Sequence, residues 1–292
     1  HLSIPASVFP KAKSKRAMRQ LERGLEEYSE NSADAVKDYN SIINLAMREY
    51  RSKKFDFSWG RGKFLADPPE KVEMTMREKE QYRGDIITAL QKLWSETEKE
   101  VYLSAAYFVP GQGGLEHMLR EENAGVHLTI VTNSLASTNA PTVYAKWEKY
   151  RKQLIESGAD VYEFMLSAEN LRGKEHDRER KQSSFSVLHS KTIVFDDDIS
   201  WIGSFNLDPR SAYFNTENVA VFESRDFAQK LRDMIIGDTV TSWHVTLQDG
   251  QPRWTGWRTG ASAPKTYKRS PDTSIFRRIW KSLCGLVPEK FV

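Results

Sequence analysis

Apolar runs of strand length alternate with longer amphipathic stretches through the middle of this chain, and this alternation limits the folds that it can adopt. The runs predict strands at 101–109, 126–132, 160–164, 185–188, 191–195, 200–203 and 217–222. The amphipathic stretches predict helices at 82–97, 115–122, 142–157 and 226–236. Because strands and helices in alternation are typical of layered domains, we expect an α/β fold.

Composition divides the chain into three parts. Residues 1–56 are rich in Lys, Arg, Glu and Ser, and the helical spacing at 17–28 and 33–50 predicts connecting helices there. An irregular stretch with the turn Asp67-Pro68-Pro69 has neither the helical nor the strand periodicity, and it marks the start of a main domain. We expect that domain at 57–245 and a tail with an amphipathic helix at 246–292.

Charge and cysteine content limit the partners of the chain. A net charge of +3 permits an anionic partner without requiring one. The single cysteine, Cys284, excludes an intrachain disulfide, and no spacing of Cys and His indicates zinc ligands, so we expect neither metal nor cofactor. No apolar run approaches the roughly 20 residues of a membrane-spanning helix. We therefore expect any membrane contact by these residues to be peripheral.

Polar residues gather at the ends of adjacent predicted strands. His189 and Lys191 are two residues apart on a strand and should face the same side of the sheet. An imidazole can attack phosphorus or protonate a leaving alkoxide, and an ammonium can neutralise phosphoryl oxygens. Ser204 and Asn206 can add hydrogen bonds to the same oxygens, and Gly203 would let the backbone approach the substrate closely. These residue types favour metal-free phosphodiester chemistry.

Each of these residues alone has an ordinary structural explanation. A histidine in a strand is more often structural than catalytic, and residues 196–198 fit a hairpin turn. Their joint spacing is more informative, because His189-x-Lys191-x4-Asp196-x6-Gly203-Ser204-x-Asn206 resembles the HKD motif of the phospholipase D superfamily.

The flanking sequence resembles the second, C-terminal HKD region of bacterial cardiolipin synthases, particularly those of the C type. Residues 203–211 and 215–217 carry this likeness, and so do 104–110 and 132–136. The resemblance implies a phospholipase-D-like α/β/α sandwich with a mixed central sheet. The family has two HKD motifs per chain and this sequence has one. An N-terminal HKD half is therefore implied, either in the same protein or on a second subunit.

The resemblance also implies roles for individual residues. Of the two family histidines, one forms a phosphohistidine and the other protonates the leaving alcohol, and by position His189 is the acid/base partner. With Lys191 and Asp196 it would form the catalytic group, in which Asp196 would orient the histidine or the neighbouring structure. Glu217 matches the acidic residue after the motif, although it is equally well explained as an ion-pair partner of Arg210.

The implied activity is that of a phosphatidyltransferase that makes cardiolipin from anionic phospholipids, bound peripherally to the cytoplasmic side of a bacterial inner membrane. Hydrolysis of phosphodiesters and an inactive domain that binds anionic lipid are the alternatives. Lys and Arg are interleaved with nearly as many carboxylates, so no nucleic acid partner is expected.

The C-terminal part offers two further patterns. Apolar residues recur at helical spacing between 273 and 286, with Arg277, Arg278 and Lys281 on other faces. This predicts an interfacial helix beside anionic lipid, or a helix that packs on its own domain or on the other half. The tryptophans at 243, 254 and 257 fit either an acyl-chain groove or a core.

Overall fold

The computed structural model describes residues 57–123, 125–166, 188–258 and 261–292, together with 43–44, 47–48 and 50–52. The chain divides into two compact units, His1–Phe57 and Ser58–Val292. This division lies one residue from the expected boundary. The predicted helix at 17–28, most of the one at 33–50 and the expected polar loop at 169–182 lie outside the described residues.

One mixed sheet of ten strands runs through the second unit in the order β1-β7-β6-β5-β2-β3-β4-β8-β9-β10. The strands are β1 (Arg61–Ala66), β2 (Glu100–Ala105), β3 (His127–Asn133), β4 (Asp160–Phe164), β5 (Lys191–Phe195), β6 (Ile199–Gly203), β7 (Asn218–Glu223), β8 (Ser242–Gln248), β9 (Gln251–Gly256) and β10 (Lys265–Tyr267). Strands β2, β3 and β4 are parallel to one another, and the other neighbours pair antiparallel.

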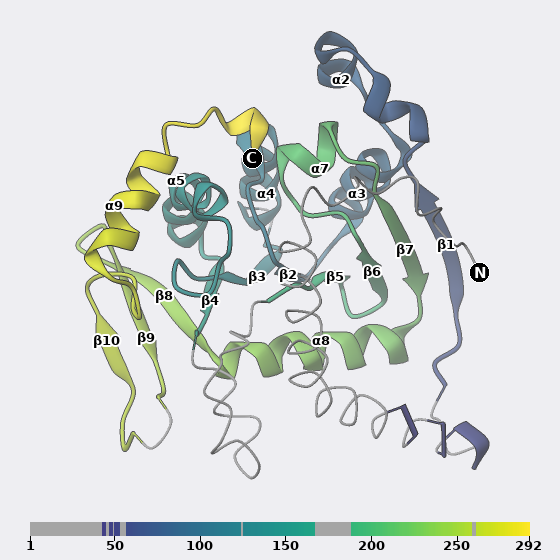
Figure 1. Ribbon diagram of the computed structural model, residues 1–292. Coiled ribbons are helices and arrows are strands. Elements are labelled where there is room, and N and C mark those ends of the chain that lie inside the picture. Colours follow the sequence, from purple (N-terminus) through teal and green to yellow (C-terminus); the bar gives the residue numbers. More distant parts are fainter. Residues whose placement is uncertain are drawn as a thin grey trace, which may run out of the picture. The chain divides into compact units, whose positions relative to one another are not determined.

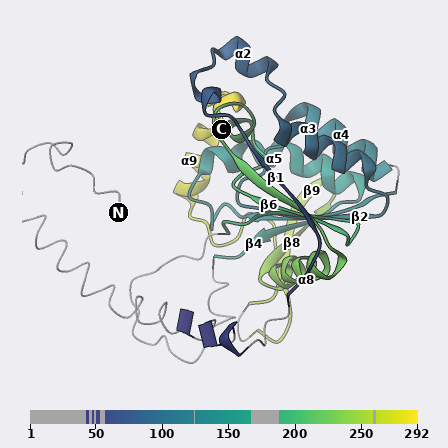
Figure 2. The ribbon, with the colours of Figure 1, turned by 90° about the vertical axis from the view of Figure 1, so that its right-hand side faces the viewer.

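Helices cover both faces of this sheet. They are η2 (Pro69–Glu73), α2 (Met76–Gln81), α3 (Asp85–Glu96), α4 (Gly111–Asn123), α5 (Pro141–Ser157), α7 (Pro209–Tyr213), α8 (Arg225–Val240), α9 (Ile275–Cys284) and η3 (Glu289–Phe291). Helix α8 lies on one face, and α3, α4 and α5 lie on the other (Figures 1 and 2). The expected α/β/α sandwich with a mixed sheet is confirmed. In the described part of the chain, no helix has the length and apolar character needed to cross a bilayer.

The three parallel strands are buried on both faces, which explains their continuous apolar runs. Leu103, Ile130 and Val161 are fully buried in β2, β3 and β4. Helix α5 ends at Gly158, whose φ of 115° is left-handed and therefore suits glycine. The helix predicted at 142–157 is confirmed to within one residue.

Several predicted boundaries differ from the structure. The strand expected at 101–109 ends at Ala105, and α4 begins at Gly111, four residues before the helix expected at 115–122. Edge strand β1 was not predicted because Leu65 is its one buried residue, so it lacks an apolar alternation. The expected boundary between 245 and 246 falls inside β8, and β9 and β10 continue the same sheet.

The tryptophans in this region divide between core and surface. Trp243 and Trp254 are buried in the core, whereas Trp257 is 53% exposed. The interpretation of the first two as core residues is therefore confirmed. The third lies just after β9, at the surface.

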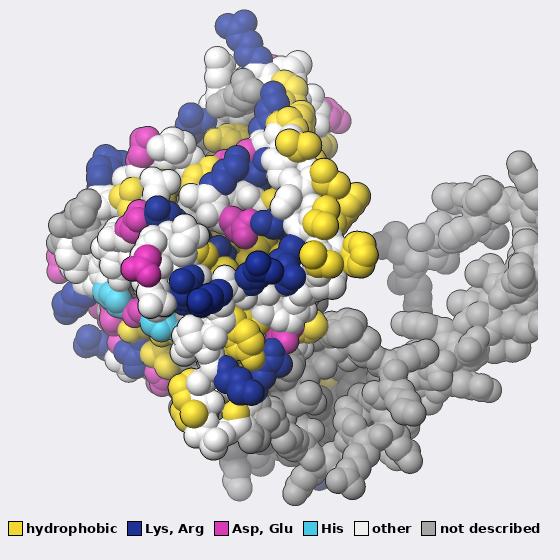
Figure 3. Space-filling view, turned by 90° about the vertical axis from the view of Figure 1, so that its left-hand side faces the viewer, with side chains coloured by type: hydrophobic (Ala, Val, Ile, Leu, Met, Phe, Trp, Pro, Cys, Tyr) yellow, Lys and Arg dark blue, Asp and Glu magenta, His cyan; other side chains and the backbone are white. Residues whose placement is uncertain are grey.

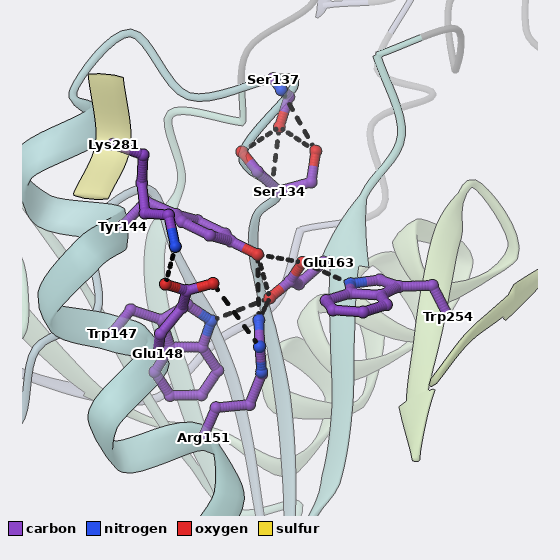
Figure 4. Close-up of polar contacts among 9 residues, drawn as sticks. All are labelled: Ser134, Ser137, Tyr144, Trp147, Glu148, Arg151, Glu163, Trp254 and Lys281. Carbon is purple, nitrogen blue, oxygen red and sulfur yellow. Dashed lines mark hydrogen bonds and ion pairs between the residues drawn. The ribbon is translucent and has the colours of Figure 1, made fainter. Parts of the chain in front are cut away.

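A buried ion pair links α5 to the sheet (Figure 4). Glu163 on β4 is fully buried and accepts a hydrogen bond of 2.6 Å from Arg151 on α5. Its carboxylate also accepts from the indole N–H groups of Trp147 at 3.1 Å and Trp254 at 2.8 Å, and from the hydroxyl of Tyr144 at 3.0 Å. The charge is thus compensated and hydrogen-bonded within the core.

Candidate active site

The predicted site residues lie at one edge of the sheet, where β2, β3 and β6 end and β5 and β7 begin. Strand pairing fixes this arrangement, because Ala105 pairs with Lys191 and Gly203 pairs with Val219. We call this border the site edge. The opposite border, where β5 ends and β2 begins, is the far edge.

His189 and Lys191 lie together at the site edge, as their spacing predicts. The Nζ atom of Lys191 is 3.5 Å from Nε2 of His189 and donates a hydrogen bond of 3.2 Å to the His189 carbonyl. His189 is exposed and Lys191 is partly buried. Burial lowers the pKa of the Lys191 amine, while the carboxylates of Glu217 and Asp208 oppose that shift. A substrate can therefore reach an imidazole next to a cation.

The buried side chain of Asn133, at the end of β3, holds the backbone just before this pair and links it to the residue that follows β2. Its amide nitrogen donates to the carbonyls of Leu188 at 2.8 Å and Ala106 at 2.9 Å, and its oxygen accepts from the Leu188 N–H at 3.1 Å. The Ala106 N–H donates to the Ser190 carbonyl at 2.9 Å. Asn133 thus acts as a positioning residue for His189, and sequence reasoning missed it.

Glu217 organises the loop next to the pair. Its carboxylate accepts hydrogen bonds from the hydroxyls of Ser204 and Ser211 and from the amide of Asn215, the last at 3.0 Å. The guanidinium of Arg210 donates to Asn215 at 3.2 Å, so it is linked to Glu217 through that amide. Because a hydroxyl donates one hydrogen bond, Ser204 does not offer a proton to a phosphate in this arrangement.

Asn206 and Gly203 were both expected to contact the substrate, and neither has the surroundings that this role predicts. The Asn206 side chain is buried, and its Oδ1 atom has no hydrogen-bond partner among the described residues. Because this oxygen only accepts hydrogen bonds, it cannot bind a phosphate oxygen, which accepts as well. A Cβ on Gly203 would lie 2.1 Å from the carbonyl oxygen of Asn218 and 2.8 Å from Cα of Val219. Gly203 is therefore required by the close approach of β7, which is a reason different from the expected approach of substrate.

The buried ion pair of Lys71 and Asp67 holds the backbone of Glu217. Asp67 accepts hydrogen bonds from Lys71 at 2.6 Å, from the Tyr82 hydroxyl at 3.0 Å and from the Glu217 N–H at 3.1 Å. Lys71 is 1% exposed and also donates to the carbonyl of Ser211 at 3.0 Å. Sequence reasoning missed these residues, because the turn that contains Asp67 was interpreted as a domain boundary.

The carboxylate of Asp208 makes the stability of the fold depend on pH. Its carboxylate caps α7 by accepting a hydrogen bond of 2.7 Å from the Ser211 N–H. Burial raises the pKa of Asp208 to about 6, with a further contribution from Glu217 and against the effect of the hydrogen bonds from Ser211. Because the folded state holds this proton more tightly than the unfolded chain, its stabilising contribution exists at low pH and is lost as pH rises through about 6.

Asp208→Asn is therefore expected to raise the free energy of unfolding relative to wild type as pH increases from 4 to 7, by up to about 3 kcal/mol. Asparagine keeps the carbonyl oxygen that caps the helix. Urea denaturation of both proteins across this pH range measures the difference. A difference that stays flat with pH would contradict the assignment.

Asp196 lies at the far edge, one full strand away from His189. Its carboxylate accepts three backbone hydrogen bonds, from Glu98 at 2.7 Å, Lys99 at 2.8 Å and Glu100 at 3.0 Å. It begins the β5–β6 hairpin turn with a left-handed φ of 50°. The placement does not bring Asp196 to the expected catalytic group and favours its alternative role, orientation of the neighbouring structure.

Asp196→Asn should destabilise the fold by about 1 to 2 kcal/mol, because one acceptor and the charge are lost while a left-handed backbone remains accessible to asparagine. Turnover should fall by less than about threefold when the protein is folded. Asp249→Asn is a matched control, since Asp249 has a φ of 53° in an exposed hairpin turn. A loss of activity as large as that of a Lys191 variant would assign Asp196 to the chemistry.

Comparison with known proteins identifies the family of the chain. A family model described as "Cardiolipin synthase, PLD-like domain" matches residues 90–238, which include the His189–Lys191 pair. The chain belongs to the phospholipase D superfamily. Within it, an uncharacterized protein of Helicobacter pylori is 32% identical over 290 residues, 99% of this chain and 55% of that protein.

Two further relatives carry functional names. Cardiolipin synthase C of Escherichia coli is 30% identical over 236 residues, 80% of this chain and 48% of that protein. The crystal structure of Nuc, a phospholipase D family member from Salmonella typhimurium, covers 65% of this chain at 14% identity and a TM-score of 0.46. The chain therefore spans about half the length of the curated relatives that it matches.

Proposed function

We propose that this chain supplies one half of the active site of a phosphatidyltransferase that makes cardiolipin from anionic phospholipids. The observation that supports the proposal most strongly is the exposed His189 imidazole beside the Lys191 ammonium at the site edge. The sequence contains one such HKD motif. A double-displacement reaction needs a second histidine. The length of the relatives leaves room for it in an N-terminal half of the same protein.

In the proposed reaction, a histidine of the other half attacks the phosphorus of one phosphatidylglycerol. The bond from phosphorus to the glycerol oxygen breaks, and His189 gives that oxygen its proton. His189 then takes the proton from a hydroxyl of a second phosphatidylglycerol, whose oxygen attacks phosphorus and releases the histidine. Lys191 neutralises the phosphoryl oxygens in both steps, and the products are cardiolipin and glycerol.

Hydrolysis is the second candidate, and the exposure of His189 favours it. Transfer to an alcohol requires that water be kept from the phosphohistidine. Within the described residues the imidazole is open to solvent. The transferase proposal therefore requires that the second half cover the site edge, whereas a phospholipase D would tolerate an open one.

The deciding experiment measures products from phosphatidylglycerol with the chain alone and with an added N-terminal HKD half. Cardiolipin that forms only with both halves supports the transferase. Phosphatidic acid alone identifies a hydrolase. No product in either mixture, together with retained lipid binding, would contradict both and favour a domain that binds anionic lipid without turnover.

A further inference from the structure

Helix α9 packs on the domain with its polar side inward. Arg277 donates to the carbonyl of Leu135 at 2.6 Å and also to that of Thr138, and Lys281 forms an ion pair with Glu148 on α5. These contacts fix the rotation of the helix about its own axis. The basic residues, which the sequence places on other faces from the apolar ones, are thus the ones that hold α9 to the domain.

The apolar side of α9 consequently faces outward. The exposed fractions of its large apolar residues, and of Leu286 just after its end, are all above one half: Ile275 59%, Phe276 79%, Ile279 54%, Trp280 59%, Leu283 55% and Leu286 81%. Figure 3 shows the side of the domain where α9 lies in Figure 1, with a band of hydrophobic side chains next to Lys and Arg side chains. A soluble domain rarely exposes so continuous an apolar stripe without a partner.

The charge around this stripe identifies the kind of partner. Residues 258–292 contain eight Lys and Arg against two Asp and Glu, a net charge of +6, whereas the whole chain carries +3. The remainder of the chain is therefore net acidic. Lys265, Lys268 and Arg269, just before α9, are exposed and have no ion-pair partner among the described residues. An apolar stripe with a cationic border matches a surface that is apolar inside and anionic outside.

The position of the stripe relates it to the site edge. Leu135 and Thr138, which bind Arg277, follow β3 directly after Asn133. At the other end of the tail, the carbonyl of Val292 accepts a hydrogen bond of 3.2 Å from the N–H of Arg210. Helix α9 and the residues after it thus contact the segment that follows β3 and the start of α7, both on the side of the sheet where the site edge lies.

We propose that the outer face of α9, defined by the six apolar residues above, docks on a lipid bilayer that carries anionic headgroups. Phe276 and Trp280 enter the interfacial region, and Lys265, Lys268 and Arg269 contact headgroup phosphates. The inference does not depend on turnover, so it stands or fails separately from the proposed function.

Vesicle co-sedimentation tests the proposal on the whole chain without any reaction. Wild type should bind vesicles of phosphatidylglycerol and phosphatidylcholine, and more weakly at high salt or with phosphatidylcholine alone. The double variant Phe276→Ser, Trp280→Ser should lower the partition coefficient at least about tenfold. Phe64→Ser is the matched control, because Phe64 is 70% exposed on edge strand β1. It should bind like wild type.

A second measurement locates the tryptophan. Lipids with brominated acyl chains should quench part of the fluorescence of wild type, and Trp280→Phe should remove that quenched part while vesicle binding persists. Absence of wild-type binding, or equal binding by the double variant, overturns the proposal. It is also overturned if the double variant loses self-association or its complex with an N-terminal HKD half while vesicle binding is unchanged, since the occupant is then a protein.

Discussion

Lys191→Ala is expected to reduce turnover of phospholipid by at least 10²- to 10³-fold, because it removes the cation that faces the phosphoryl oxygens. Its Nζ atom lies 3.5 Å from the His189 imidazole, so the same substitution also changes the electrostatic environment of the acid/base group. The measurement is initial rate with phosphatidylglycerol, using the chain assembled with a second HKD half.

A folded protein is required for this test to be informative. Lys191 is partly buried and its ammonium donates to one backbone carbonyl, so the alanine variant should unfold within about 1 kcal/mol of wild type. Lys63→Ala, an exposed lysine on β1, serves as the control and should retain full activity. Unchanged turnover in the Lys191 variant would remove this lysine from the mechanism under both the transferase and the hydrolase proposals.

Arg151→Met should destabilise the domain by about 3 to 5 kcal/mol, because it leaves the carboxylate of Glu163 buried without its cation. Glu163 is fully buried, and Arg151 donates to it at 2.6 Å and to the Tyr144 hydroxyl at 2.9 Å. Guanidinium denaturation measures the loss. Lys152→Met, at the next position of α5, is exposed and should change stability by less than about 0.5 kcal/mol.

A second variant separates charge from packing. Combining Arg151→Met with Glu163→Gln removes both charges, so the double variant should recover part of the stability that the single variant loses. If Arg151→Met were no more destabilising than Lys152→Met, the ion pair would contribute nothing to the fold. Full loss in both single and double variants would assign the effect to packing against the ring of Trp254, 5.0 Å from the guanidinium carbon.

The strands that the sequence predicted contain buried residues, but β8, whose Trp243 and Val245 are buried, was not predicted. β3 and β5 are buried over nearly their whole length, and their apolar residues located them in the sequence to within a residue or two. β1 and β10 are edge strands with mostly exposed side chains, and no apolar pattern distinguishes them from loops. Tertiary pairing alone makes them strands.

The candidate site was predicted where residues are close in sequence. His189 and Lys191 were found because a short sequence pattern contains both: Lys191 begins β5, and His189 lies two residues before it. Asn133 and Asp67 were missed because their contacts with this segment join residues far apart in sequence, and no local pattern encodes such distances. Asp196 shows the opposite case, since it belongs to the same motif yet lies at the far edge.

The position of β5 has a consequence for how the pair is assembled. Strand β5 pairs antiparallel with β2, which is far from it in the sequence. It therefore connects the parallel strands to the meander of β5, β6 and β7, whose members are neighbours in the sequence. Local hairpins form early in folding, and distant pairings form late. A fragment with the meander alone would keep the motif but lose the backbone clamp from Asn133. We therefore expect the Leu188 amide to gain protection from hydrogen exchange only when the meander docks on the parallel strands. The pair of His189 and Lys191 is then held in place only in the completed fold.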